Sequence, residues 1–370
     1  MIPVNTPLLD GNEKKYLTEC IDTGWISSEG PFITQFETQF ASKMGRKHGI
    51  AVCNGTAAID AAIIALGIAA GDEVIMPTFT IISCIAELVR VGAIPVLVDT
   101  DPLTWNMDVS LIEPLITPKT KAIMVVHTYG LPVDMAPILD LANRYKLKII
   151  EDAAEMHGQT YSGAPCGSFG DISTFSFYSN KHITTGEGGM IVTNSDILAS
   201  RCRSLRNLCF QPQQRFVHEE LGWNMRMTNL QAAVGVAQLE RLDEFVRKKR
   251  AMGKRYTEQL ASLSEFIELP LDATEYAQNI YWVFGIVLKE SVPFDAVHAM
   301  RQLTTQQVGS RPFFYPMHLQ PVLRKLGLFT ADYHPVAERI STRGFYIPSG
   351  LGLTDLQMDT VVDAVKSLFQ

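Results

Sequence analysis

The sequence predicts an α/β fold, in which a large and mostly parallel β-sheet is covered by helices and is followed by a smaller C-terminal α/β unit. Short apolar segments alternate with helical segments through the first half of the 370 residues, which is typical of βαβ units. Hydrophobic residues make up 46% and charged residues 19% of the chain, as in a globular protein with a large core. We expect two units, residues 1–245 and 246–370.

The elements of the first unit follow from apolar periodicity and from the residues that end helices. Two helices come first, and a glycine follows each of them; they are Asp10–Asp22 and Pro31–Met44. The predicted strands are Ile50–Cys53, Glu73–Met76, Ile94–Val98, Ala122–Val126 and Lys148–Glu151. The helices between them are Thr56–Leu66, Thr80–Val91, Val109–Ile116 and Met135–Tyr145.

The remaining elements complete the large sheet and build the C-terminal unit. Two further strands, Ile172–Phe177 and Met190–Thr193, are expected to join the same sheet. One long amphipathic helix is expected to run from Thr228 past Arg250 and to connect the two units. The C-terminal unit is predicted to contain, in order, strand Tyr281–Leu288, helix Phe294–Leu303, strand Tyr346–Ile347 and helix Asp355–Leu368.

Charge and cysteine usage exclude several classes of protein. The net charge is −7 and no basic run is present, so we expect no nucleic-acid or membrane partner. The first residues lack the pattern of a signal peptide, and Ala57–Ala70 is too short to span a bilayer. The six cysteines are scattered, as in a cytoplasmic protein with reduced thiols. We expect a cytoplasmic protein without a metal site.

One lysine is distinguished by its surroundings. Lys181 follows a short apolar strand and aromatic residues, and the turn Gly186-Glu187-Gly188-Gly189 comes after it. A lysine amine held at the end of a strand can form an imine with an aldehyde. A lysine after a strand is more often a solvated surface residue, and it is the aromatic and glycine context that favours a functional role here.

An aspartate upstream provides the second half of the pattern. Asp152 ends the strand Lys148–Glu151, where burying a carboxylate is costly unless the carboxylate is paired. A protonated pyridine nitrogen is a fitting partner, although a cap for the following turn would also place an aspartate here. An imine-forming lysine and a buried aspartate are the groups that pyridoxal phosphate (PLP) chemistry requires. Glu155 could approach the substituents of the ring.

A phosphate-binding segment is predicted where the first strand meets its helix. Gly55 would allow close approach of the backbone, Thr56 would add a hydroxyl, and the free N–H groups of the helix start attract an anion. Ser176, shortly before Lys181, could also bind phosphate oxygens. An ordinary helix cap has the same pattern. Phe79 follows the second strand and could lie flat on a planar ring, although a phenylalanine at a strand end is usually a core residue.

Together these segments resemble the PLP-dependent sugar aminotransferases of the DegT/DnrJ type, which have the aspartate aminotransferase fold (PLP fold type I). The resemblance covers nearly the whole chain. The nucleotide fingerprints G-x-G-x-x-G and G-x-x-x-x-G-K-[ST] are missing, which disfavours an NAD-dependent sugar enzyme or an NTPase. The motifs that carry the resemblance are GWISSEG (residues 24–30), NGTAA (54–58), GDEVI (71–75), EDAA (151–154), FSF (175–177) with Asn180-Lys181, GEGG (186–189) and GWNMRMTN (222–229).

The resemblance implies a role for each candidate residue. Lys181 would bind the cofactor aldehyde and carry protons, and Asp152 would pair with the pyridine nitrogen. Gly55, Thr56 and Ser176 would hold the phosphate, and Phe79 would stack on the ring. Asn224 would reach the phosphate in a neighbouring subunit, so that the active unit would be a homodimer or homotetramer with shared active sites.

Two features point to a subgroup within the family. Many members carry glutamine where Glu155 stands, and glutamate is found in the subgroup that aminates the 4-keto carbon of GDP-4-keto-6-deoxy-D-mannose to give GDP-perosamine. The segment Arg311–His318 also resembles this subgroup, which implies that Phe314 and His318 contact the nucleotide sugar; packing of the C-terminal unit is the alternative. A related subgroup that dehydrates the sugar has histidine in place of Lys181, so lysine favours amine transfer.

The sequence therefore predicts an aminotransferase that moves an amino group from L-glutamate to a nucleotide-linked keto sugar, for a surface polysaccharide such as O-antigen in lipopolysaccharide biosynthesis. Two alternatives stay open. The substrate could be a 3- or 4-keto sugar linked to dTDP or UDP. The chain could also be a PLP-binding regulatory protein without catalytic activity.

Overall fold

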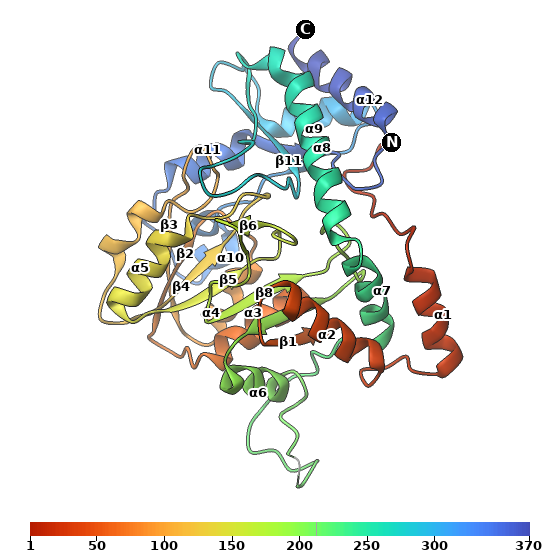
Figure 1. The fold of residues 1–370 in the computed structure, drawn as a ribbon. Helices are drawn as coiled ribbons and strands as arrows, with labels where there is room; N and C mark the ends of the chain where they lie inside the picture. The colour runs from red at the N-terminus through yellow and green to blue at the C-terminus, as the bar shows by residue number, and fades with distance from the viewer. Residues whose placement is uncertain (212) are drawn as a thin grey trace.

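The computed structural model describes residues 1–211 and 213–370. Its largest element is a seven-stranded sheet, and the long helix α8 (Leu242–Leu260) leads from there to a second, smaller sheet (Figure 1). The α/β fold predicted from the sequence is confirmed. In spatial order the large sheet contains β1 (His48–Val52), β9 (Gly189–Thr193), β8 (Ile172–Ser176), β5 (Lys148–Asp152), β4 (Thr120–Val126), β2 (Glu73–Pro77) and β3 (Ile94–Val98).

Most of the large sheet is parallel. Strands β8, β5, β4, β2 and β3 run in one direction, and β9 is antiparallel to both of its neighbours. The two later strands that were expected to join the sheet do so. Because β8 and β9 are neighbours that run in opposite directions, the segment between them begins and ends at the same edge of the sheet. That segment contains Lys181.

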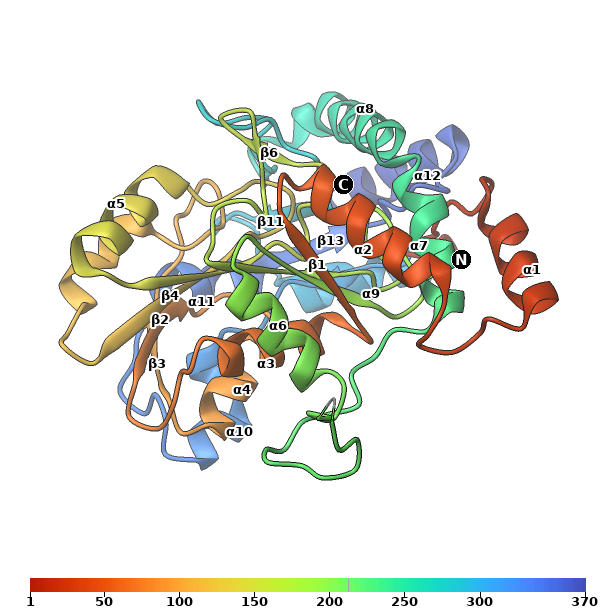
Figure 2. The same ribbon diagram turned by 60° about the horizontal axis from the view of Figure 1, so that its bottom comes forward.

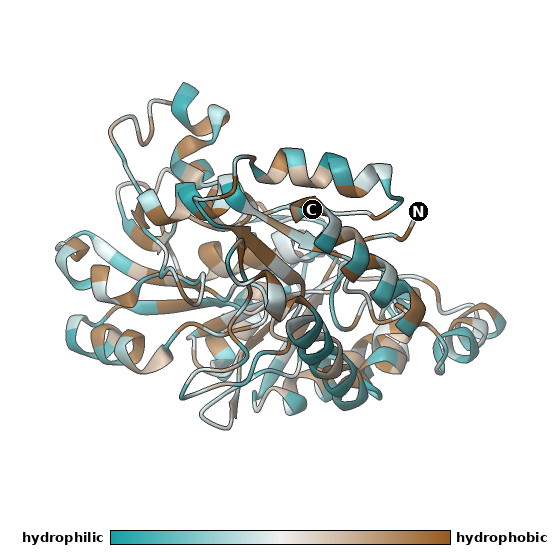
Figure 3. Cartoon of the chain, turned by 90° about the horizontal axis from the view of Figure 1, so that it is seen from above, coloured by the Kyte–Doolittle hydropathy of each residue, from teal (hydrophilic) through white to brown (hydrophobic). Residues whose placement is uncertain are grey.

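Apolar faces of the helices cover both sides of the large sheet (Figure 2). One core packs beneath α2 (Pro31–Lys43), α5 (Met135–Tyr145) and α7 (Asn229–Leu239), and α1 (Glu13–Thr23) lies against α7. The opposite core packs beneath α3 (Gly55–Ala65), α4 (Ser83–Arg90) and α6 (Asp196–Leu205). The strands of this sheet are mostly hydrophobic while the helices carry polar residues along one side (Figure 3), as expected for a sheet buried on both faces.

The C-terminal part is built on an antiparallel four-stranded sheet. Its order is β10 (Ile267–Glu268), β11 (Phe284–Leu288), β13 (Gly344–Ile347) and β12 (Arg311–Pro312). Helices α8 (Leu242–Leu260), α9 (Ala296–Thr305) and α12 (Asp355–Lys366) share one apolar core with it. The smaller elements are the hairpin β6 (Thr160–Tyr161) and β7 (Ala164–Pro165), α10 (Pro321–Lys325), α11 (Pro335–Arg343) and the 3₁₀ turns Ala261–Leu263, Met317–Leu319 and Ser367–Phe369.

The two sheets meet at an aromatic cluster. Phe79, Trp105 and Tyr129 come from segments of the large sheet, and Trp282 and Phe313 come from the C-terminal part. The predicted boundary between residues 245 and 246 falls inside α8, and the division into two units stays a prediction. The start of the chain lies against the C-terminal part, where the backbone N–H of Ile2 donates to the carbonyl of Gln307.

Two predicted helices are wrong. The segment Val109–Ile116 forms two short 3₁₀ turns, Val109–Leu111 and Glu113–Leu115, because Pro114 lacks the N–H that a longer helix needs. The single helix from Thr228 past Arg250 is divided into α7 and α8. The side chain of Arg241 at the break binds Asp10 and Glu244. The resulting bend lets α7 pack against the large sheet while α8 runs to the C-terminal part (Figure 1).

The strand predicted at Tyr281–Leu288 begins later, at Phe284. Tyr281 has a φ of 48°, in the left-handed region that ends or precedes a strand. Its neighbour Trp282 therefore leaves the sheet and turns toward the cavity described below.

Among the helices of the described residues, none combines the length and the apolar character that a membrane span requires.

Candidate active site

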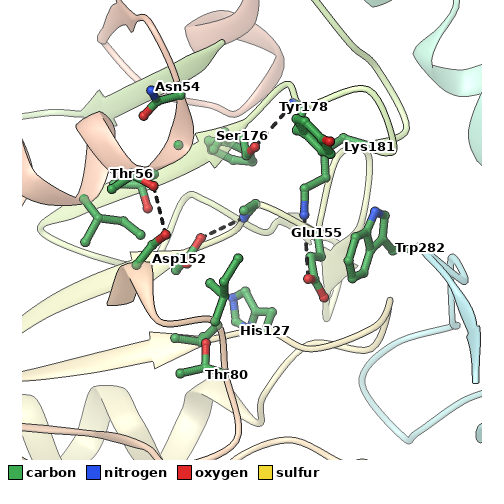
Figure 4. A pocket seen from close by; sticks show the side chains of 18 of the residues that line it. Asn54, Thr56, Thr80, His127, Asp152, Glu155, Ser176, Tyr178, Lys181 and Trp282 are labelled. Atoms are coloured by element: carbon green, nitrogen blue, oxygen red, sulfur yellow. Dashed lines mark hydrogen bonds and ion pairs between the residues drawn. The ribbon is translucent and has the colours of Figure 1, made fainter. Parts of the chain in front are cut away.

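A cavity of about 370 Å³ opens at the carboxyl ends of β5 and β8, beside the first turn of α3. This is the edge at which ligands bind in open α/β sheets. Its walls come from both parts of the chain: Lys181, Asp152 and Thr56 belong to the large sheet and its helices, and Trp282 and Tyr346 to the C-terminal part. Figure 4 shows the polar side chains converging on this space.

Lys181 extends into the cavity from the segment between β8 and β9 (Figure 4). Its Nζ lies 3.6 Å from Oε1 of Glu155 and 3.9 Å from the centre of the Trp282 ring. Burial lowers the pKa of the Lys181 amine, and the negative charges of Glu155 and Asp152 oppose that effect. The site therefore favours an amine that loses its proton more readily than a lysine in water.

The local sequence explains why the chain turns back around Lys181. Phe177 is buried against Phe36 and Phe40, which fixes the start of the segment. Gly186 has a φ of 81°, which suits glycine. At the end of the segment, a Cβ on Gly189 would lie 2.3 Å from the carbonyl oxygen of Asn54. The glycines that were singled out in the sequence thus allow the lysine segment to pass close to the start of α3.

Asp152 is the last residue of β5 and is buried at the floor of the cavity. One carboxylate oxygen accepts a hydrogen bond from the backbone N–H of Ala154 at 3.0 Å, and the other accepts from the thiol of Cys84 at 3.3 Å. Burial raises the pKa of Asp152, although these hydrogen bonds and Lys181 act in the opposite direction. A cationic ring nitrogen placed here would favour the ionised carboxylate.

Glu155 faces Lys181 from the turn that follows β5. Its Oε2 accepts a hydrogen bond of 2.7 Å from the backbone N–H of Tyr129. Burial raises the pKa of Glu155 to about 7, against the opposing effect of Lys181. Near neutral pH this carboxyl group can therefore either accept or donate a hydrogen bond.

The start of α3 forms the third wall. Asn54 caps the helix by accepting from the N–H of Ala57, which leaves the N–H groups of Gly55 and Thr56 directed out of the first turn. A Cβ on Gly55 would lie 2.8 Å from Cβ of Ser176, so only glycine lets the two segments approach this closely. The Thr56 hydroxyl shares a hydrogen bond of 2.8 Å with Ser83. Together these groups form an anion-binding cradle.

Three residues that were predicted to contact the cofactor or the sugar lie outside the cavity lining among the described residues. In the part of the chain that the structure describes, the cavity lining does not include Phe79, His318 or Asn224. Phe79 is buried behind the wall, against Tyr129 and Phe313. His318 is fully buried, with one ring nitrogen 2.7 Å from the Thr78 hydroxyl and the other 3.0 Å from Glu338. Packing in the core explains the positions of Phe79 and His318. The ring stacking predicted for Phe79 and the sugar contact predicted for His318 therefore have no support in this geometry.

Asn224 is exposed and pairs with Asn207, which lies just after the end of α6. Its side-chain oxygen accepts a hydrogen bond of 3.0 Å from Arg226. An exposed position is what the predicted reach into another subunit requires. Phe314, the other predicted sugar contact, does line the cavity.

Sequence reasoning missed several residues that line the cavity. Ile81, rather than Phe79, presents its side chain, and it is 47% exposed. Tyr178, Trp282 and Tyr346 add aromatic rings to the lining, beside Phe175 and Phe314. The run of aromatic residues at 281–284 is a signal for Trp282, but alternate residues of such a run face opposite ways and the sequence does not say which faces the site.

The cavity contains polar atoms that lack a partner. Among the described residues, the buried Oγ1 of Thr174 and Oδ1 of Asn180 have no hydrogen-bond partner, and both residues line this space. Unpaired buried polar atoms are costly, and a bound polar ligand would satisfy them. The anion cradle at Gly55, the buried Asp152 and the amine of Lys181 fit, in turn, the phosphate, the ring nitrogen and the aldehyde of PLP.

Fold and site together define the class as a PLP-dependent enzyme with an aspartate aminotransferase-like α/β sheet. The chain belongs to the DegT/DnrJ/EryC1/StrS aminotransferase family, which matches residues 7–366. The family assignment confirms the resemblance drawn from the motifs, and the cofactor of its aminotransferases is pyridoxal phosphate.

Individual relatives are similar over their whole length. The chain is 45% identical to a GDP-perosamine synthase from Caulobacter vibrioides, covering 99% of this chain and 98% of the relative. It is 42% identical to a GDP-perosamine synthase from Vibrio cholerae, covering 100% of this chain and 99% of the relative. Among solved structures, the aminotransferase from Psychrobacter cryohalolentis superimposes with a TM-score of 0.91 at 30% identity, over 99% of both chains.

Proposed function

We propose that this PLP-dependent sugar aminotransferase converts GDP-4-keto-6-deoxy-D-mannose to GDP-perosamine, with L-glutamate as the amino donor. The observation that carries the chemistry is the buried amine of Lys181, held 3.6 Å from Glu155 in a cavity that also contains Asp152. The choice of substrate is supported by the relatives from Caulobacter and Vibrio, which share 45% and 42% of their residues with this chain and are GDP-perosamine synthases.

PLP supplies an aldehyde carbon and an electron-withdrawing ring when bound. Lys181 would hold that carbon, and its free amine would be the group that moves a proton at the reacting carbons. The lowered pKa of Lys181, caused first by burial, increases the fraction of unprotonated amine near neutrality. Asp152, as an ionised carboxylate, would pair with the ring nitrogen and favour its protonated form.

The remaining residues orient the cofactor and the sugar. Gly55, Thr56 and Ser176 would hold the phosphate at the start of α3, and Glu155 would hydrogen-bond to the ring oxygen. Ile81, which lines the cavity while Phe79 is buried, would contact the ring in place of Phe79. The aromatic side of the lining then faces the sugar nucleotide, with Phe314 as a contact; aromatic rings pack well against apolar faces of ligands and limit the access of water.

Chemical trapping tests the role of Lys181. Borohydride reduction of the PLP-loaded protein, followed by peptide mapping, is expected to place the label on Lys181. A label on another residue, or none in fully loaded protein, would refute this role. A Lys181→Ala protein that retains normal turnover would refute it independently.

A substrate panel tests the sugar. We expect GDP-4-keto-6-deoxy-D-mannose to give the highest kcat/KM, and 3- or 4-keto sugars linked to dTDP or UDP to react at least about tenfold less well, the equivalent of about 1.4 kcal/mol in transition-state binding. Comparable rates with a 3-keto sugar would contradict the proposed substrate. A PLP absorbance band that glutamate does not change would favour the regulatory alternative.

The proposed active unit is a homodimer in which Asn224 reaches the phosphate site of the other subunit. Support comes from large exposed apolar side chains on neighbouring segments: Trp25 is 51% and Leu221 85% exposed. The backbone carbonyl of Trp25 accepts a hydrogen bond from Asn229, which links residues 24–30 to the segment that carries Asn224. Such exposed apolar side chains are typical of an interface.

Subunit complementation tests this sharing of sites. Lys181→Ala and Asn224→Ala proteins are each expected to have low activity. Mixed dimers place both substitutions in one site and leave the other site complete, so mixing followed by dissociation and reassociation should restore activity. Failure of the mixture to exceed either parent, in dimers shown to have exchanged subunits, would contradict a shared site.

A further inference from the structure

Trp282 covers the amine of Lys181. Its indole ring lies beside the end of the lysine side chain, next to Glu155 (Figure 4), and the Lys181 Nζ is 3.9 Å from the ring centre. Trp282 is only 5% exposed. A cation over the face of an indole is attracted by the negative face of the ring, and the attraction is stronger where water is excluded.

Two hydrogen bonds of Trp282 and the packing of the residue before it fix the indole in this position. Its Nε1–H donates a hydrogen bond of 2.9 Å to the carbonyl of Asn180, the residue before Lys181. The backbone carbonyl of Trp282 accepts a hydrogen bond of 3.0 Å from the buried amine of Lys249. The preceding residue, Tyr281, has a φ of 48°, and a Cβ on Gly253 of α8 would lie 2.3 Å from its ring. The position of Trp282 is thus set by contacts from both parts of the chain.

The indole face is a close neighbour of the amine in addition to the carboxylates. The 3.6 Å separation between Lys181 and Glu155 is longer than a normal N–H···O hydrogen bond. The other ionisable groups that act on Lys181 are Asp152 and Cys84, which lie toward the floor of the cavity. A positively charged amine therefore has the carboxylate of Glu155 and the face of the Trp282 indole as close neighbours, at 3.6 Å and 3.9 Å.

We propose that Trp282 is a positioning residue whose indole face stabilises the charged form of the Lys181 amine and keeps that amine directed into the cavity. This inference rests on the proposed function of Lys181. It assigns to the C-terminal part of the chain a direct influence on the proton-carrying group of the large sheet. Without the aromatic face, the amine loses its proton more easily and its orientation is set by the carboxylates alone.

Fluorinated tryptophans provide a test that preserves the shape of the side chain. Ring fluorine atoms weaken the negative face of the indole while the Nε1–H to Asn180 hydrogen bond stays in place. We would introduce tryptophan with increasing fluorine content at position 282 by site-specific incorporation. The pKa of Lys181 would be measured in cofactor-free protein, from the pH dependence of acetic anhydride labelling quantified on the peptide that contains this residue.

The expected result is a stepwise fall in the pKa of Lys181 with each added fluorine, by about half a unit or more across the series. Trp105 is the matched control, because it is equally buried, contacts Phe313 and lies outside the cavity lining among the described residues. The same series at position 105 should leave the pKa unchanged. A pKa that stays constant or rises with fluorination at position 282 would overturn the proposal.

Failure of this proposal and failure of the proposed function are distinguishable. The pKa measurement uses no cofactor and no sugar, so it reports only on the contact between Trp282 and Lys181. Borohydride trapping reports only on the attachment of PLP to Lys181. A constant pKa with successful trapping would reject the role of Trp282 alone.

Discussion

The amine of Lys181 and the carboxylate of Glu155 lie 3.6 Å apart, and both side chains are nearly inaccessible, with exposed fractions of 10% and 8%. Burial opposes the charge on each of them, while their mutual attraction favours both charges. A buried pair of this kind is sensitive to the loss of either member, because the remaining charge has no compensation. The first prediction concerns this pair.

Glu155→Gln is expected to change how stability depends on pH in the cofactor-free protein. The pKa of Glu155 is raised from 4.5 to about 7, first by burial. Between these values the folded protein binds more protons at this residue than the unfolded chain, so the Glu155 contribution to stability falls as pH rises. Denaturant unfolding at about pH 5 and about pH 8 measures this effect. The free energy of unfolding of the natural protein should fall between these pH values, and that of the variant should not show this fall. Parallel curves for the two proteins would contradict the raised pKa.

Asp152→Asn is expected to lower kcat/KM. Asparagine can still accept the hydrogen bond from the Ala154 N–H, but it cannot supply the negative charge for a protonated ring nitrogen. We expect a fall of about 10- to 200-fold, which corresponds to the roughly 1.5–3 kcal/mol of a hydrogen bond to a charged group. Steady-state kinetics with glutamate and the keto sugar give the measurement.

Asp140→Asn is the control for that change. Asp140 lies on the exposed side of α5 and pairs with Arg144 four residues later, a surface contact of small energy. Its kinetics should match those of the unchanged protein. Equal kinetics for the Asp152 variant as well would remove the assigned role of Asp152.

Gly55→Ala is expected to weaken PLP binding. The added Cβ would lie 2.8 Å from Cβ of Ser176 and would push apart the two segments that form the phosphate cradle. Spectrophotometric titration of cofactor-free protein should show an affinity loss of about tenfold or more, equivalent to about 1.4 kcal/mol. Gly163→Ala in the β6–β7 turn has open space around its Cβ but a φ of 84°, so it introduces backbone strain without touching the cradle. Weaker PLP binding by both variants to the same extent would indicate a general effect of destabilisation.

Lys249→Met is expected to alter the pH dependence of stability in the opposite sense to Glu155→Gln. Burial lowers the pKa of Lys249 from 10.5 to about 7. Between these values the unfolded chain binds more protons here than the folded protein, so the stability contributed by Lys249 rises with pH. The neutral amine still donates to the carbonyls of Trp282 and Ser349. Denaturant unfolding should show that the free energy of unfolding of the natural protein rises between about pH 7 and about pH 9.5. The methionine variant should not show this rise.

The sequence alone was sufficient to place the candidate site residues that lie at the ends of strands. Asp152 ends β5 and Lys181 follows β8, and the carboxyl ends of neighbouring parallel strands must meet at one edge of a sheet. Gly55 and Thr56 could be placed for the same reason, at the junction of β1 and α3. These positions depend on local pattern and on one topological rule.

Residues in irregular segments could not be placed in this way. Whether Phe79 or Ile81 faces the cavity depends on how the chain turns after β2, and Phe79 is drawn instead into the aromatic cluster with Tyr129. His318 follows the same logic, because Thr78 and Glu338 occupy both of its ring nitrogens. Such choices are made by tertiary packing.

Long-range contacts limited the prediction of secondary structure in the same way. The break between α7 and α8 coincides with the binding of Arg241 to Asp10, which is far away in the sequence. The left-handed φ of 48° at Tyr281, which turns Trp282 toward Lys181, accompanies close packing on Gly253. A periodic pattern contains neither piece of information.

The two walls of the cavity have different origins in the chain. The ionisable groups proposed to carry protons come from the large sheet and its loops, whereas Phe314 and Tyr346 belong to the C-terminal part. For enzyme engineering this separation means that acceptor preference can be diversified by randomising positions 314 and 346 in a combinatorial library while the transamination machinery stays untouched.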